Sequence, residues 1–222
     1  MRRAGPVVAV VLAVVFLVVP SVARLVFLLG DAAAGDATDA AFRAHPATGL
    51  WHIVPGLGMV ALAPLQLSPR VRARWPALHR WGGRFFVLAA LSVCITAVRM
   101  NVVFPVVGGA LKLSVIYAMA AALAVTLALG LRAMLRREVA AHRRWMLRAT
   151  GVMLSGGGAG VFALPMFAAG WSVDRVTGVG RWLGFVATMA AVELWLRADG
   201  AAQTGAAAAA SPPDGPPGAP AP

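Results

Sequence analysis

Residues 111–131 read LKLSVIYAMAAALAVTLALGL, and this stretch decides the fold class. Its one charged residue, Lys112, lies at the edge of an otherwise uncharged run. A helix of about 20 residues is long enough to cross the ~30 Å hydrocarbon core of a bilayer. The stretch therefore predicts a transmembrane helix.

Similar apolar runs lie on both sides of this stretch. They cover residues 7–29, 50–67, 81–98, 149–169 and 182–196. The last run is short for a membrane span, so Arg181 and Arg197 at its ends are expected to extend toward the lipid–water boundary. The sequence thus predicts an all-α fold, a polytopic membrane helix bundle of about six transmembrane helices over residues 1–198.

The composition of the whole chain excludes the main alternatives. Of its 222 residues, 60% are hydrophobic and 13% are charged, and the mean hydropathy is +0.79. Soluble domains carry about 25% charged residues, and disordered chains are poor in apolar side chains. A soluble globular domain and a wholly disordered chain are both excluded, and the lipid bilayer is the expected partner.

The end of the chain differs in composition from the rest. Residues 199–222 contain a run of alanines followed by a segment rich in Pro and Gly. Such a segment has no apolar face whose burial would offset the entropy cost of ordering. We expect a disordered cytoplasmic tail over residues 199–222.

The chain carries 20 basic and 8 acidic residues, a formal net charge of +12. In a soluble protein this excess would indicate nucleic-acid binding, but fourteen of the basic residues fall in alternate segments between the spans. These are Arg2, Arg3, Arg70, Arg72, Arg74, Arg80, Arg84, Arg132, Arg136, Arg137, Arg143, Arg144, Arg148 and Arg197. Because Lys and Arg are enriched in cytoplasmic loops, both termini are predicted to be cytoplasmic, and no nucleic-acid partner is expected.

The first apolar run has a second interpretation. Arg2 and Arg3, the apolar stretch and the small residues at 21–23 are also typical of a secretory signal with its cleavage site. The apolar run continues through Leu29, beyond the usual length of such a signal. We expect a retained span, with a cleaved signal as the alternative.

Two histidines begin spans that enter the membrane from the same side. His79 opens the string HRWGG at 79–83, and His142 opens the string HRRWM at 142–146. Helices that enter from one leaflet bring their first residues to one depth, where two imidazoles can hold one haem iron. His79 and His142 are therefore candidate ligands of a haem b.

The neighbours of these histidines suit the same hypothesis. Arg80 and Arg143 are candidate partners of the haem propionates, while Gly83, together with Gly82, leaves a helix face without bulk for a flat macrocycle. The same strings also suit an interfacial belt, in which aromatic rings lie at headgroup depth and arginines face anionic lipid. In that alternative the histidines hold no metal.

Two other spans carry features of interest. His52 lies on a stripe of residues 50–67 that is expected to face the bundle interior, since polar groups on a span avoid lipid. It is a weaker candidate metal ligand. The run GGGAG at 156–160 is expected to permit close helix packing, with a flexible or broken helix as the alternative.

Three motifs together resemble a known family. They are PLQLSPR at 64–70, HRWGG at 79–83 and HRRWMLR at 142–148. In these motifs the chain resembles the uncharacterised bacterial membrane proteins grouped as domain of unknown function 2306. The resemblance implies a multi-pass protein of the bacterial plasma membrane, and it implies no reaction, because the family has no established activity.

A looser similarity is to cytochrome b561-type transmembrane electron carriers, in which paired histidines on the spans hold haem. His52, His79 and His142 fall on the second, third and fifth spans, as three of the four ligands of that type would. The fourth is expected on residues 111–131, which contain no histidine. The similarity therefore implies one haem, between His79 and His142.

Two classes of function remain open. One is a single-haem b-type electron carrier with bis-histidine ligation on the cytoplasmic side, which would need a redox partner or a quinone. The other is a non-enzymatic multi-pass membrane protein, a small-molecule transporter or an assembly factor, with interfacial histidines and no haem. The sequence has no Ser-His-Asp set, phosphate-binding glycine loop or carboxylate pair, so no catalytic residue is predicted.

Overall fold

The computed structural model describes residues 4–104 and 107–210, and within these ranges it contains helices and no strand. The helices are α1 (Ala4–Leu29), α2 (Ala37–Ala44), α3 (Pro46–Leu67), α4 (Pro69–Arg74), α5 (Pro76–Val103), α6 (Gly109–Leu135), α7 (Val139–Ala168) and α8 (Val173–Ala210). Six of them, all but α2 and α4, are long and apolar enough to cross a membrane. The predicted all-α, six-span bundle is thereby confirmed.

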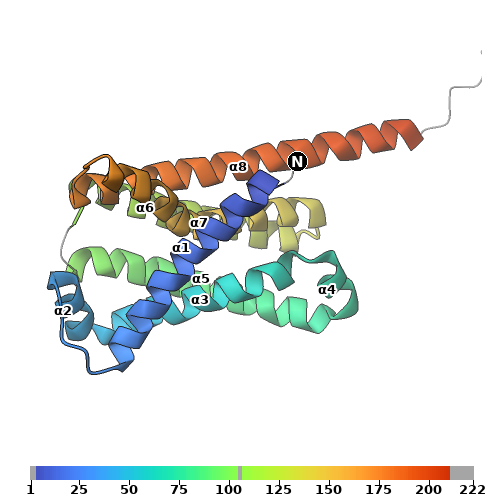
Figure 1. Cartoon of the computed structure of the whole chain (residues 1–222). Helices are drawn as coiled ribbons and strands as arrows, with labels where there is room; N and C mark the ends of the chain where they lie inside the picture. The colour runs from blue at the N-terminus through green and yellow to red at the C-terminus, as the bar shows by residue number, and fades with distance from the viewer. Residues whose placement is uncertain (1–3, 105–106, 211–222) are drawn as a thin grey trace, which may run out of the picture.

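The short helices mark the two ends of the bundle (Figure 1). We call these the α2 end and the α4 end. Successive long helices run in opposite directions, so α5 and α7 begin at the α4 end, whereas α3, α6 and α8 begin at the α2 end.

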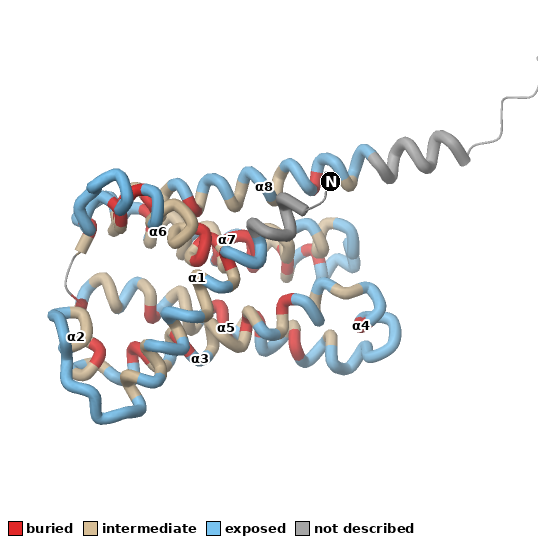
Figure 2. Tube along the Cα trace, in the orientation of Figure 1, coloured by how far each residue is buried: buried red, intermediate tan, exposed pale blue. Residues whose placement is uncertain are grey.

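Four of the spans share a central apolar core. It contains Met59 of α3, Phe86 and Ala90 of α5, Leu123 of α6 and Val152 of α7, all of them buried. Figure 2 shows the buried residues facing inward and the exposed ones lining the outside of the bundle. Because lipid tails are as apolar as these side chains, it is van der Waals packing between them that holds the helices around one centre.

The outer surface is also apolar. Leu88 and Ile95 of α5 are 68% and 67% exposed, and Leu135 of α6 is 79% exposed. Exposed apolar area of this extent is unfavourable in water. These side chains are suited to a lipid environment, as the composition requires.

The last helix is longer than its apolar run predicts. It begins at Val173, ahead of the predicted start at residue 182, and continues to Ala210, past the predicted start of the tail at residue 199. Residues 199–210, part of the predicted tail, thus continue α8. Ala is the best helix former, and adding residues to an existing helix avoids the cost of nucleation. The Pro- and Gly-rich residues 211–222 lie outside the described residues.

The two short helices are not predicted by the apolar pattern. The Asp36 side chain accepts a hydrogen bond from the Asp39 amide and so caps α2. Asp39 in turn pairs with Arg24 of α1, and this hydrogen bond holds the pKa of Asp39 below its usual range. The ring of Phe42 packs edge-to-face on Phe104, 4.6 Å between centroids, which fastens α2 to the bundle.

Glycines let α7 approach both α1 and α8 closely. Any side chain at Gly157 would collide with the backbone carbonyl of Ala13 in α1, and a Cβ at Gly160 would lie 2.6 Å from the Phe16 ring. A Cβ at Gly158 would lie 2.9 Å from Thr188 Oγ1 of α8. Because α7 remains one continuous helix through this run, the packing interpretation of residues 156–160 is supported.

Charged pairs also connect α7 to α8. Arg148 donates to both carboxylate oxygens of Glu193, at 2.5 and 3.0 Å. Arg143 donates to Asp199 at 2.7 Å. Both pairs involve partly exposed side chains. They orient α8 relative to α7, whereas the glycines allow the two helices to approach closely.

Arg148→Glu is expected to lower the free energy of unfolding by about 1.5–3 kcal/mol, the usual contribution of hydrogen bonds to charged groups. The change removes two such bonds and places two carboxylates against each other. The double variant Arg148→Glu/Glu193→Arg should recover most of the loss. Unfolding in mixed micelles of a mild detergent and dodecyl sulfate measures both. Arg144, exposed on the same helix, gives the control Arg144→Glu, and an equal loss there would contradict the role of the pair.

Candidate functional site

The two histidines predicted as haem ligands lie at the α4 end, near the starts of α5 and α7. His142 Nδ1 donates to the Gly130 carbonyl at 2.9 Å, which leaves Nε2 with a free lone pair. His79 Nδ1 is buried and has no hydrogen-bond partner.

The residues around this pair differ from the expectation. The Gln66 side chain of α3 occupies the space beside Gly82, where any Cβ would collide with it, and a Cβ at Gly83 would also touch Gln66, at 3.7 Å. Gln66 Nε2 is itself buried without a partner. The helix face that was expected to receive a macrocycle is therefore filled by an amide side chain.

Of the two arginines predicted to pair with haem propionates, one already has a partner within the protein. Arg143 is paired with Asp199 and lies over the Trp195 ring, at 5.3 Å from its centroid. Arg80 is exposed at the surface. In this arrangement the surroundings of His79 and His142 do not fit a haem. The two imidazoles are still side chains of a type that can coordinate iron. Their ligation of iron stays a prediction.

Other metal chemistry has little basis in the described part of the chain. Within residues 4–104 and 107–210, no three His, Cys, Asp or Glu side chains gather as a metal-binding group. His52, the weaker candidate ligand, lies apart from the other two, toward the α2 end in α3. At this position His52 borders an interhelical cavity.

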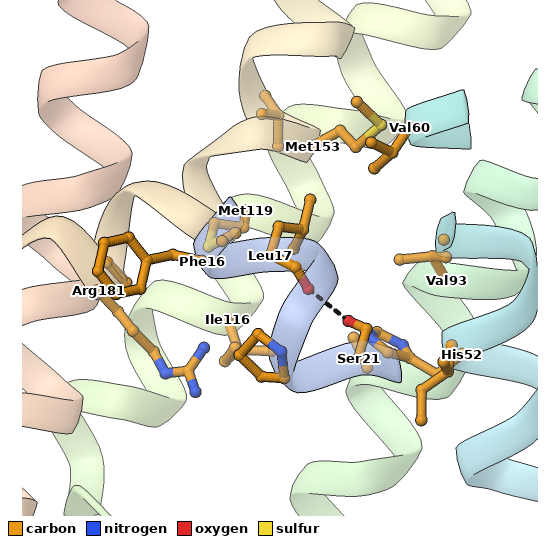
Figure 3. A pocket seen from close by; sticks show the side chains of 18 of the residues that line it. Phe16, Leu17, Ser21, His52, Val60, Val93, Ile116, Met119, Met153 and Arg181 are labelled. Atoms are coloured by element: carbon orange, nitrogen blue, oxygen red, sulfur yellow. Dashed lines mark hydrogen bonds between the residues drawn. The ribbon is translucent and has the colours of Figure 1, made fainter. Parts of the chain in front are cut away.

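A cavity of about 500 Å³ lies between the spans and is lined by His52. All six long helices contribute to its wall. Most of the lining side chains are apolar, among them Phe16, Leu17, Ile53, Leu57, Met59, Val60, Val93, Ile116, Met119, Leu123, Val152, Met153 and Phe167. Figure 3 shows these walls converging from different helices on one space.

Most polar groups of the cavity wall are satisfied within the protein. Ser21 Oγ donates to the Leu17 carbonyl at 2.7 Å. The Thr96 hydroxyl donates to the Ser92 carbonyl at 2.6 Å, so its oxygen accepts from His52 Nδ1 at 3.0 Å. These groups are held by the helices around them and do not require a ligand.

Arg181 of α8 is the charged residue of the cavity wall. Its Nε is buried and has no hydrogen-bond partner, and the residue lines the cavity. In Figure 3 the Arg181 side chain extends from α8 toward Ile116 of α6, across the cavity from His52. A charged side chain inside a transmembrane bundle is costly and usually marks a functional site.

Arg181 was predicted to lie at the membrane boundary, because the apolar run begins only at Trp182. The structure places it two turns inside α8, since that helix begins at Val173. The missed signal is the pair of glycines in GVGR at 178–181. A Cβ at Gly178 would lie 3.2 Å from Leu111 of α6, so α8 is already packed into the bundle before Arg181.

The comparisons with known proteins agree with the fold. Residues 49–196 match the family described as "Predicted membrane protein (DUF2306)". No curated protein and no solved structure matches the chain. The matched range runs from α3 into α8 and includes His52, His79, His142 and Arg181. The chain therefore belongs to the DUF2306 family of predicted membrane proteins.

Proposed function

We propose that this membrane protein binds a small molecule with a largely apolar body in the interhelical cavity and acts as a small-molecule transporter. The observation that carries the proposal is a cavity of about 500 Å³ to which every span contributes. Ligand pockets commonly measure about 300–1,000 Å³ and are lined mainly by apolar side chains. A ligand in contact with all six helices would influence their relative positions, which transport requires.

Transport is favoured over catalysis by the state of the polar wall groups. Ser21 and His52 are hydrogen-bonded to neighbouring helical groups, and the Cys94 thiol faces the Ala120 carbonyl at 3.7 Å. Among the described residues of the cavity wall, no nucleophile is paired with a base, as acyl or group transfer would need. The cavity is suited to binding without chemistry.

Binding of tritiated dodecanol tests this proposal. We expect saturable binding, with one site per chain, to the protein in nanodiscs of phosphatidylcholine. Empty nanodiscs should take up dodecanol without saturation, by partition into lipid. Uptake by the protein-containing nanodiscs that equals the empty-nanodisc value would contradict a ligand site in the cavity.

We further propose that the α4 end faces the cytoplasm, because the arginines of α4, of the start of α5 and of the α6–α7 turn gather there and cytoplasmic segments are rich in Arg. Green fluorescent protein fused after Arg137 should be fluorescent. Alkaline phosphatase fused after Gly170, at the opposite end, should be active. The reverse pattern would refute this orientation.

A second candidate is a single-haem electron carrier. It is favoured by the buried, unpartnered His79 Nδ1 and by the hydrogen bond that leaves His142 Nε2 free. It would require Gln66 to leave the space beside Gly82. A b-type band in the reduced-minus-oxidised spectrum, lost in His79→Ala and in His142→Ala, would support it, and a spectrum without haem bands would remove it.

A further inference from the structure

Arg181 carries a positive charge that the described residues do not neutralise. Its Nε is buried without a partner, and the side chain forms no ion pair with any carboxylate of residues 4–104 and 107–210.

The carboxylates that could have neutralised this charge are hydrogen-bonded to other groups. Asp174, one of the first residues of α8, accepts from the Gly108 amide at 2.7 Å and so holds the α5–α6 connection. Asp39 pairs with Arg24, and Glu193 pairs with Arg148. A buried charge is tolerated in proteins when it is paired and hydrogen-bonded, so the missing partner of Arg181 is expected to come from outside the chain.

We propose that the cavity ligand is an amphiphile with one compact anionic head group, a carboxylate or a phosphate monoester, and that Arg181 binds this head group. This inference rests on the proposed function, since it names the class of molecule that the cavity takes. A guanidinium presents a planar fork of donors that matches two oxygens of a carboxylate or a phosphate. The apolar walls described above would hold the tail.

The shape of the cavity gives the ligand a direction. Arg181 lies in the part of α8 near the α2 end, whereas Val60 and Met153 line the other side of the cavity, toward the core (Figure 3). The head group would therefore lie at the α2 end and the tail would point to the bundle centre. A cation at one end and apolar walls beyond it select a charged amphiphile over a sugar or a metal ion.

Binding of three probes tests the inference: laurate, dodecyl phosphate and the neutral dodecanol, each measured with the protein in phosphatidylcholine nanodiscs. Arg181→Met should weaken the binding of laurate and of dodecyl phosphate at least tenfold and leave dodecanol binding unchanged. Arg181→Lys, which keeps the charge but loses the fork, should give a smaller loss. Arg175→Met removes one exposed arginine from the same helix and should change none of the three.

The outcomes separate the two proposals. The anionic probe that binds more tightly and depends more on Arg181 identifies the head group as carboxylate or phosphate. Saturable binding of all three probes with no dependence on Arg181 would overturn the anion assignment alone. Absence of saturable binding of every probe to the wild-type protein would overturn the proposed function itself. Dodecanol binding by Arg181→Met shows that the variant is folded.

Discussion

Gly157→Ala is expected to lower the free energy of unfolding by about 3 kcal/mol, at the upper end of the usual 1–3 kcal/mol cost of overpacking. The added methyl group would collide with the backbone carbonyl of Ala13. A backbone atom cannot rotate away, as the end of a side chain can. Helix α1 must therefore move as a unit, and its contacts with α7 weaken along their length.

The neighbouring residue gives a matched control. A Cβ at Gly156 would lie 3.4 Å from Leu17 Cδ1, an ordinary van der Waals contact. Ala is favoured over Gly in a helix by about 1 kcal/mol, so Gly156→Ala should be neutral or slightly stabilising. Unfolding in mixed micelles, followed by circular dichroism, measures both variants. Equal stabilities for the two would show that α1 does not pack on α7 as described.

Gly56→Leu is expected to reduce dodecanol binding at least tenfold, a change of about 1.4 kcal/mol in binding free energy. Gly56 lines the cavity, and a Cβ there would touch only Val93 Cγ2, at 3.8 Å. The backbone therefore accepts the substitution, while the rest of the leucine side chain would enter the space that the ligand needs.

The control for this variant lies on the same helix. Ala61 of α3 is exposed and does not line the cavity, so Ala61→Leu places the same final side chain on the lipid-facing side. It should bind dodecanol as the wild type does. Wild-type affinity in Gly56→Leu would mean that dodecanol binds outside the cavity.

The spans could be predicted from sequence because lipid requires every backbone group to be hydrogen-bonded within the segment. The predicted run 111–131 lies inside α6, and 50–67 lies inside α3. The ends were less accurate, because hydropathy registers only the apolar part of a helix. Thus α8 begins at Val173, ahead of a run that starts after Arg181.

The candidate site was harder to predict, because it depends on which side chains meet between helices. Hydropathy placed Arg181 at a boundary, and nothing in the chain near it shows that Asp174 is engaged by Gly108. For the histidine pair, the positions of the residues were predicted but their surroundings were not. Similar strings placed His79 and His142 at one end of the bundle, but they did not reveal that Gln66 of α3 fills the space beside Gly82.

The most direct test is the position of a bound ligand in a crystal of the wild-type protein grown with 12-bromododecanoate. The anomalous signal of bromine locates the end of the tail. We expect a bromine peak inside the cavity near Val60 and Met153, with the carboxylate within hydrogen-bonding distance of Arg181. Bromine peaks only on the outer surface, with none in the cavity, would contradict the proposal that this protein binds a small molecule between its helices.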